Sequence, residues 1–280
     1  MNGFYVNEGM LREFEGYMHD DEKSKATIEK YIRDVKRFMA FAGGRELDKS
    51  LIIEYKESLS GLYAVSSANS MIAALNYFLR YCGLESYCVK QFKVQSRIYC
   101  SEQRELTRAE YMRLVNAAGR KKSRRTELLL QTICGTGIRV SELKFITVEA
   151  VCRGEATVSC KRKTRTVFIP YKLQKKLRYY CRERGITSGA VFVTRTGKPL
   201  NRCSVWREMK ALCRDACVSP DKVFPHNLRH LFARTFYGIE RDVAKLADLL
   251  GHSSLNTTRI YIMETGKQHR RKIEKMKLII

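Results

Sequence analysis

Five side chains from residue 139 onward stand out as a set that could together bind an anion and transfer a proton. They are Arg139, His226, Arg229, His252 and Tyr261. Arginine binds anionic oxygens with paired donors, histidine exchanges a proton near neutral pH, and a tyrosine hydroxyl becomes a nucleophile when cations and a base assist it. Each residue alone has an ordinary interpretation as a solvated arginine, a polar helix end or a packed aromatic ring. Order and spacing must decide between these interpretations.

The five residues lie in three short segments whose order and spacing are specific. In chain order the segments are 136–143 (TGIRVSEL), 225–230 (PHNLRH) and 249–261 (LLGHSSLNTTRIY). They closely resemble the signature boxes of the tyrosine recombinases, the phage integrase and Xer family. The separations of 26 residues from His226 to His252, and of nine from His252 to Tyr261, are similar to those of Xer-type members. The resemblance covers residues 105–265 and extends more weakly to 1–98.

The resemblance implies a site-specific DNA recombinase that needs no metal, cofactor or ATP. Tyr261 would attack a phosphodiester, release a 5′-hydroxyl and form a covalent 3′-phosphotyrosyl link. Arg139 and Arg229 would clamp the non-bridging oxygens as negative charge develops on them. His226 would take the tyrosine proton and return it when the DNA is rejoined. The sequence also offers no cluster of Asp and Glu suited to Mg²⁺, which argues against a two-metal nuclease.

The same resemblance implies three supporting roles. His252 would hydrogen-bond the phosphate. Glu142 would orient the site from one helical turn beyond Arg139, with a surface ion pair between the two as the alternative. The leaving 5′-oxygen would take its proton from a lysine on a basic hairpin. Alignment selects Lys161, but Lys163 lies two residues further on, and the choice between them stays open.

The charge of the chain points to a polyanionic partner. Its 280 residues include 53 Lys and Arg against 29 Asp and Glu, a net charge of +24. Residues 1–100 hold 14 basic and 13 acidic residues, so nearly all of the excess lies in the remaining 180. We therefore expect double-stranded DNA as the partner, bound by two domains of which the C-terminal one supplies most of the attraction.

Residues 1–98 are expected to form a helical domain, similar to the SAM-like core-binding domain of the family. Apolar residues recur at three- and four-residue intervals over 24–43 and 68–82, and shorter helical patterns cover 9–19 and 48–60. The expected DNA contacts of this domain are the basic residues of its long second helix, Lys30, Arg33, Lys36 and Arg37.

A linker at 99–104 is expected to lead into a catalytic domain at 105–280. Thr107 and Glu110 have the spacing of a capping box and predict a helix start. Further helical patterns follow up to residue 145 and after residue 171, with one short strand-like segment at 190–193.

Between these helices, alternating residues predict a β-hairpin with strands at 156–160 and 166–170 and a basic tip at 161–165. The tip would contact DNA through Arg162, Lys163 and Arg165. The expected fold class is therefore mainly α with a small β-hairpin (α+β).

Other classes of protein fit the composition poorly. Ten cysteines contain no C-x-x-C pair, which argues against a structural zinc cluster and favours reduced thiols. No signal region and no apolar stretch of about 18 residues is visible, so we expect no membrane partner and a cytoplasmic protein.

The biological role is open at this stage. A mobile-element integrase is the first expectation, with an Xer-like resolvase of chromosome or plasmid dimers as the alternative. A type IB-like topoisomerase and a non-catalytic DNA-binding protein are the rivals outside these roles. The family works as a homotetramer on DNA with exchanged C-terminal segments. Here residues 268–280 form a basic stretch with an apolar end that could dock on a neighbour or on its own core.

Overall fold

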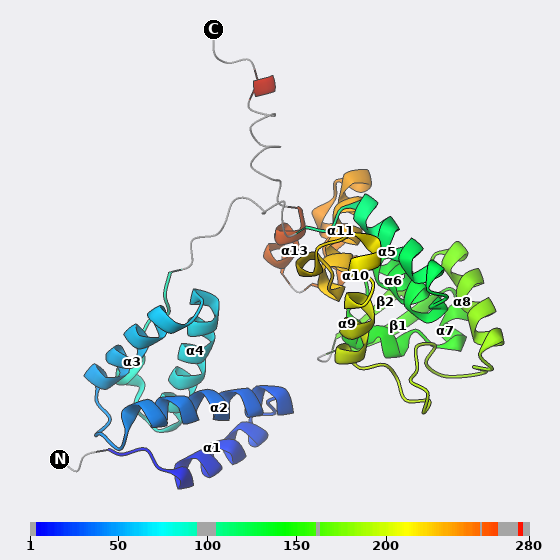
Figure 1. Ribbon diagram of the computed structural model, residues 1–280. Coiled ribbons are helices and arrows are strands. Elements are labelled where there is room, and N and C mark those ends of the chain that lie inside the picture. Colours follow the sequence, from blue (N-terminus) through cyan, green and yellow to red (C-terminus); the bar gives the residue numbers. More distant parts are fainter. Residues whose placement is uncertain (1–3, 94–104, 161–162, 253, 263–273, 277–280) are drawn as a thin grey trace. The chain divides into compact units, whose positions relative to one another are not determined.

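The computed structural model describes residues 4–93, 105–160, 163–252, 254–262 and 274–276 (Figure 1). The chain divides into two compact units, Met1–Ser96 and Arg97–Ile280. Each unit encloses a hydrophobic core of its own. Among the described helices, none combines the length and the apolar character that crossing a membrane requires.

Unit 1 is a bundle of helices. They are α1 (Glu8–Asp20), α2 (Lys25–Ala42), α3 (Lys49–Leu62) and α4 (Val65–Tyr81), followed by the 3₁₀ turn η1 (Glu85–Tyr87). The side chains of Asn7, Ser24 and Asp48 accept backbone N–H bonds at the N-caps of α1, α2 and α3. The four helices expected from hydrophobic periodicity are confirmed.

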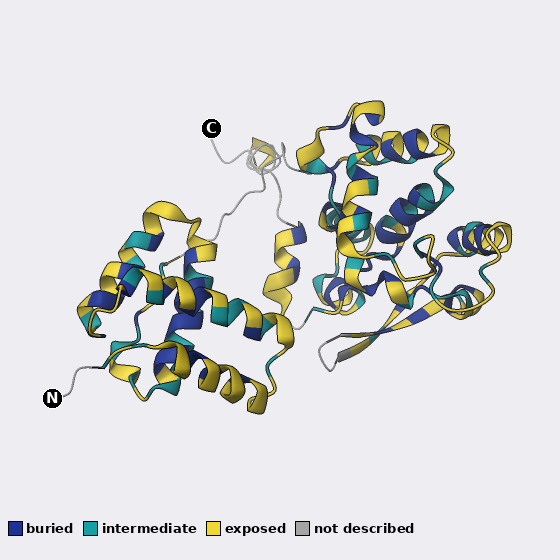
Figure 2. Cartoon of the chain, turned by 60° about the horizontal axis from the view of Figure 1, so that its bottom comes forward, coloured by how far each residue is buried: buried dark blue, intermediate teal, exposed yellow. Residues whose placement is uncertain are grey.

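Aromatic residues fill the core of the bundle. Phe14, Phe38 and Phe78 are fully buried, and the rings of Phe14 and Phe78 meet edge to face with centroids 5.1 Å apart. Figure 2 shows the buried residues on the inner faces of these helices and the exposed residues on the outer faces. This amphipathic pattern explains why periodicity alone located the helices.

Unit 2 combines helices with one hairpin. Its elements are α5 (Arg108–Arg120), α6 (Arg124–Thr136), η3 (Val140–Phe145), α7 (Val148–Arg153), β1 (Glu155–Cys160), β2 (Lys163–Phe168), α8 (Tyr171–Glu183), α9 (Arg202–Lys210), α10 (Cys213–Ala216), η4 (Pro220–Lys222), α11 (Pro225–Glu240), α12 (Val243–Leu250) and α13 (Leu255–Ile262). The capping box of Thr107 and Glu110 is confirmed at the start of α5.

The packing of α6, α11, α12 and α13 positions the three signature segments of unit 2. Helix α11 packs against α6, and Leu128, Ile133 and Leu228 belong to their shared core. Helices α12 and α13 pack on α11 around a smaller cluster that includes Leu246 and Leu250. Because these helices pack on one another, the three signature segments lie close together although they are distant in sequence.

The hairpin is longer, and its tip shorter, than the sequence suggested. Strands β1 and β2 pair antiparallel from Glu155↔Phe168 to Cys160↔Lys163. Thr164 and Arg165, expected in the tip, are therefore paired strand residues, because the ladder continues up to a two-residue connection. The connection itself, 161–162, lies outside the described residues.

The strand expected at 190–193 is wrong. Its backbone forms only isolated bridges, Thr147↔Ala190 and Val193↔Pro199. Val191 and Phe192 are nonetheless buried in the core of unit 2. The short apolar run therefore reflects burial of a loop, which periodicity cannot distinguish from a strand.

Candidate active site

The turn after α6 places Arg139. Helix α6 ends at Thr136, and Gly137 continues in the left-handed conformation with φ 65°. A Cβ atom on Gly137 would lie 2.4 Å from the ring of Phe232, so only glycine fits both this conformation and this contact. The side chain of Arg139 projects from the start of η3 and remains about one third exposed, at 35%.

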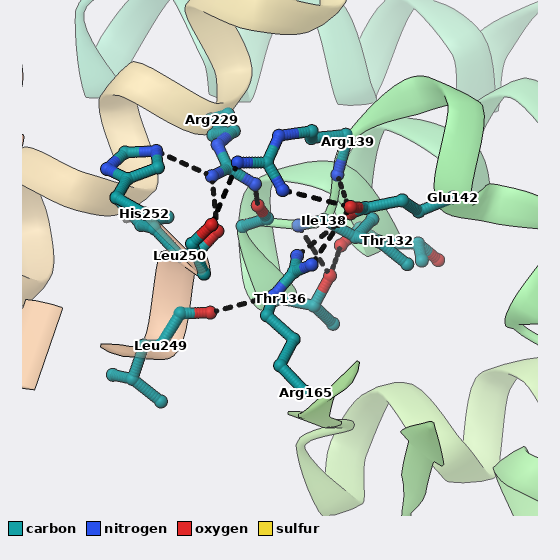
Figure 3. Close-up of polar contacts among 12 residues, drawn as sticks. Thr132, Thr136, Ile138, Arg139, Glu142, Arg165, Arg229, Leu249, Leu250 and His252 are labelled. Carbon is teal, nitrogen blue, oxygen red and sulfur yellow. Dashed lines mark hydrogen bonds and ion pairs between the residues drawn. The ribbon is translucent and has the colours of Figure 1, made fainter. Parts of the chain in front are cut away.

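Glu142 lies buried in the middle of the site, with 1% of its surface exposed. Its Oε1 accepts hydrogen bonds from Nη1 of Arg139 and Nη1 of Arg165, each at 2.9 Å. Its Oε2 accepts from the backbone N–H of Arg139 at 2.9 Å and from Nη2 of Arg165 at 2.8 Å (Figure 3). Burial would raise the pKa of Glu142, but the bonds from Arg165 and Arg139 outweigh it and lower the pKa to about 2. The carboxylate is therefore ionised at neutral pH.

Arg229 is the most deeply buried cation of the site, also with 1% exposed. From α11, its Nη1 donates to the carbonyl of Gly137 and its Nη2 to the carbonyl of Leu250, both at 2.7 Å. Burial and the charge of Arg139 lower its pKa to about 10, which leaves it charged at neutral pH. Its buried Nε has no hydrogen-bond partner among the described residues.

The end of α12 accepts hydrogen bonds from three arginines. The carbonyl of Leu249 accepts from Nε of Arg165 at 3.2 Å, that of Leu250 from Arg229, and that of Gly251 from Nη2 of Arg139 at 3.3 Å. The last carbonyls of a helix lack partners within the helix and carry its negative dipole end, so they suit cations. Three consecutive carbonyl groups thus hold the three arginines close together, two of them on Glu142, and three arginines against one carboxylate leave an excess of two positive charges.

His252 lies directly after this helix end and contacts Arg229. Its Nε2 is 2.9 Å from Nη2 of Arg229, and its Nδ1 is 2.8 Å from Oγ1 of Thr258. Since arginine only donates, Nε2 must accept and the proton must sit on Nδ1. Burial and the charges of Arg229 and Arg139 lower the pKa of His252 to about 4. Both ring nitrogens therefore have protein partners here, where the sequence suggested a bond to phosphate.

Tyr261 of α13 is buried, with 4% exposed, and its ring packs in the cluster around Leu250. Its hydroxyl oxygen lies 3.4 Å from Nε2 of His226. The rings of His230 and His252 lie beside it, with centroids 4.3 and 5.3 Å from its own. The ring of Tyr261 is therefore packed in a hydrophobic cluster, as its sequence context suggested, while its hydroxyl is in position to react.

His226 and His230 are one turn apart on α11 and meet edge to face, with centroids 4.8 Å apart. Loss of solvation and the charges of Arg229, Arg139 and Arg202 lower the pKa of His226. Burial and the neighbouring His226 lower the pKa of His230 to about 4. A neutral His226 imidazole can accept a proton, as the sequence analysis expected. His230 had no expected role, although its i,i+4 spacing from His226 indicated a shared face.

The basic hairpin residues that were expected to contact DNA differ in where the structure places them. Lys161 and Arg162 lie outside the described residues, and Lys163 begins β2. Arg165, for which a DNA contact was expected, turns into the site and binds Glu142, with 13% of its side chain exposed. Sequence alone does not show this placement, because it does not show that Glu142 is buried and requires a cation.

The expected contacts on α2 also divide. The Lys30 ammonium donates to Asp34 at 2.6 Å and to the carbonyl of Ser70 at 3.1 Å, so both bonds tie it to the bundle, and its expected contact with DNA stays a prediction. Arg33, Lys36 and Arg37 are exposed on α2. These three lie together along one groove of the surface.

Among the described residues, no group of His, Cys, Asp and Glu is arranged to hold a metal ion.

Comparison with known proteins defines the class. Residues 104–268 match the model of the phage integrase family, and the chain belongs to this family, the tyrosine recombinases, which cleave and rejoin DNA through a phosphotyrosyl intermediate. Its relatives include the tyrosine recombinase XerA of Pyrococcus furiosus, 31% identical over 96% of this chain and 94% of the relative. The tyrosine recombinase XerD of Xanthomonas campestris is 30% identical over 88% of this chain and 84% of the relative. The family resemblance is confirmed.

Solved structures agree on the fold. A crystal structure of XerA recombinase, 24% identical, aligns over 97% of this chain and 99% of the other with a TM-score of 0.54. A lambda integrase dimer bound to a COC′ core site, 18% identical, aligns over 95% of this chain and 79% of the other with a TM-score of 0.76. The expected fold class, mainly α with a small hairpin, is confirmed.

The lowered histidine pKa values predict that mild acid destabilises unit 2. In an unfolded chain histidines bind protons below about pH 6.5, whereas His230 and His252 resist protonation in the fold until about pH 4. The unfolded state then holds more protons, so the free energy of unfolding must fall as the pH drops from 6.5 to 4. His252→Gln removes one such group and keeps an acceptor for Arg229, which should flatten this fall.

Urea titrations at several pH values, followed by fluorescence, measure this effect. Trp206 of α9 is the one tryptophan of the chain and reports on unit 2. The same pH slope in His252→Gln and in the unmodified protein would show that His252 is not held neutral by the fold.

Proposed function

We propose that this protein recombines DNA at a specific site, with Tyr261 as its nucleophile. The observation that carries the proposal is the contact between the Tyr261 hydroxyl and His226, 3.4 Å apart, beside the buried Arg229. A base touches the nucleophile, and permanent cations stand where charge would develop. The active-site residues come from three separate segments and converge on one place.

Each proton and bond in the proposed reaction has a place. His226 takes the hydroxyl proton as the Tyr261 oxygen attacks phosphorus, and the bond from phosphorus to the 5′-oxygen breaks. Arg139 and Arg229 hold the non-bridging oxygens. A hairpin lysine, Lys161 by alignment with Lys163 as the alternative, protonates the departing oxygen. Rejoining reverses these steps. Since one phosphodiester is exchanged for another, no ATP is required, and the two arginines supply the positive charge that a metal would otherwise provide.

His252 acts in this proposal as a neutral acceptor that aligns Arg229. Its other ring nitrogen, Nδ1, donates to Thr258, and the phosphate bond that the family resemblance implies would use this donor in place of Thr258. Glu142 orients Arg139 through its backbone N–H and its Nη1, while the Arg139 side chain stays 35% exposed and so accessible to a phosphate. The surface ion pair considered as its alternative does not describe a carboxylate with 1% exposure.

The two units divide the binding of DNA. We propose residues 1–98 as a core-binding domain, with Arg33, Lys36 and Arg37 facing the backbone, and 105–280 as the catalytic domain after a linker at 99–104. Arg162 and Lys163 would approach DNA from the hairpin. A lambda integrase tetramer bound to a Holliday junction is among the solved structures of this fold. A homotetramer on two duplexes, joined through residues 268–280, is proposed here too.

Two biological roles fit this chemistry. Integration of a mobile element is the first, and Xer-type resolution of chromosome or plasmid dimers is the second. Similarity to relatives named XerA and XerD over most of the chain supports the second. Either reaction takes place on DNA in the cytoplasm, and the fully described cysteines are free thiols, as is usual in a reducing compartment.

The nucleophile is tested with a suicide substrate, nicked so that rejoining fails. The unmodified protein should accumulate a covalent adduct through a 3′-phosphate, and Tyr261→Phe should bind DNA equally well and form none. Denaturing gels of protein with end-labelled DNA measure the adduct. Undiminished adduct in Tyr261→Phe would exclude Tyr261, and no adduct in either protein would favour a non-catalytic DNA-binding role.

The general acid is tested with a 5′-bridging phosphorothiolate, whose sulfur leaves without a proton. If Lys161 is the acid, Lys161→Ala should cleave the normal substrate slowly and the sulfur substrate at nearly the normal rate. Arg139→Lys should lose about 10²- to 10³-fold on both substrates, since the clamp is needed in either case. Single-turnover rates decide the assignment, and sulfur rescue of Lys163→Ala alone would move the role to Lys163.

A further inference from the structure

Arg165 stands on the inner face of the hairpin. Along β2 and the residue after it, Val167 and Ile169 are buried, whereas Thr164 and Thr166 are exposed. Arg165 shares the alternation of the buried residues, and 13% of its side chain is exposed. A cation on the inward face of a strand needs a partner inside the protein.

Arg165 has two such partners on different segments. Its Nη1 and Nη2 bind both oxygens of Glu142, at 2.9 and 2.8 Å, in the bidentate geometry that suits a carboxylate. Its Nε donates to the carbonyl of Leu249 at 3.2 Å. One guanidinium thus joins the hairpin both to η3 and to the end of α12.

The side chain reaches these partners by passing close to Gly251. A Cβ atom on Gly251 would lie 2.5 Å from Cδ of Arg165, and Gly251 has φ 63°. Glycine is therefore needed both for the backbone conformation and for the passage of Arg165. The backbone at Gly251 thus leaves room for the Arg165 side chain, and α12 packs directly against β2.

From this geometry we infer that Arg165 is a positioning residue that anchors the hairpin to the catalytic site, and is not a DNA contact. The inference rests on the proposed function, in which a lysine of this hairpin protonates the 5′-oxygen. That lysine lies two to four residues before Arg165, so the anchor fixes where its ammonium stands. Arg139 binds Glu142 through its own backbone N–H and Nη1, separately from the bonds that Arg165 makes.

The test is Arg165→Lys, which keeps the charge and loses the bidentate fork. We expect single-turnover cleavage of the normal substrate to slow by about 10²-fold, the effect of misplacing a reacting group by about 1 Å. On the 5′-phosphorothiolate substrate most of this loss should disappear, since the sulfur needs no proton. DNA affinity and its salt dependence should be unchanged in both Arg165→Lys and Arg165→Gln.

Two results would overturn the inference. Equal slowing of Arg165→Lys on both substrates would show that Arg165 acts on Arg139 and not on the hairpin. A salt slope reduced by about 0.9 in Arg165→Gln would show one lost phosphate contact. Arg153→Lys makes the same change at an exposed position of α7 and should alter nothing.

Hydrogen exchange provides a readout that does not depend on catalysis. In Arg165→Lys the backbone amides of β2 should exchange at least several-fold faster, while those of α6 keep their protection, which also shows that the variant is folded. If the unmodified protein forms no adduct, the proposed function falls while faster exchange in β2 still supports the anchor. Unchanged exchange in β2 would refute the anchor whatever the cleavage rates.

Discussion

A single buried carboxylate organises this site. Glu142 has four acceptor positions, and two arginines with one backbone N–H fill them all. A carboxylate removed from water is costly unless every such position is satisfied, so burial of Glu142 requires Arg139 and Arg165 to stay on it. The arrangement gathers cations that would otherwise repel one another, and it leaves the excess positive charge that a phosphodiester requires. Glu142 thus both orients the arginines and sets the net positive charge of the site.

The end of α12 completes the arrangement. Leu249, Leu250 and Gly251 present three carbonyls to Arg165, Arg229 and Arg139 in turn. Because these arginines come from β2, α11 and η3, one helix end fixes segments that are far apart in sequence (Figure 3). The glycines of the signature segments follow from the same packing, since a Cβ atom on Gly137 would overlap Phe232 and one on Gly251 would overlap Arg165. The signature segments therefore contain residues required for packing as well as residues required for catalysis.

Sequence reasoning succeeded where the signal was local. Periodicity located the bundle helices, and spacing located the capping box at Thr107. It failed where a partner lay elsewhere in the chain: Arg165 was predicted in the hairpin tip because its partner Glu142 is 23 positions away, and nothing near Lys30 in sequence indicated its bond to the carbonyl of Ser70. Alternation with Val167 could have shown that Arg165 faces inward. No local pattern could have shown that His252 would bind Arg229 and Thr258 at once.

The most direct test of this account is the cleavage rate of Glu142→Gln, measured in single turnover beside its affinity for the same DNA. The substitution keeps the shape and removes the negative charge, so simple electrostatics would let the site bind phosphate at least as tightly and cleave at least as fast. If Glu142 instead acts by orienting Arg139 and Arg165, affinity should hold or rise while cleavage falls by about 10²-fold. Glu155→Gln makes the same charge change at an exposed position of β1 and should alter neither quantity. Normal cleavage by Glu142→Gln would contradict the account.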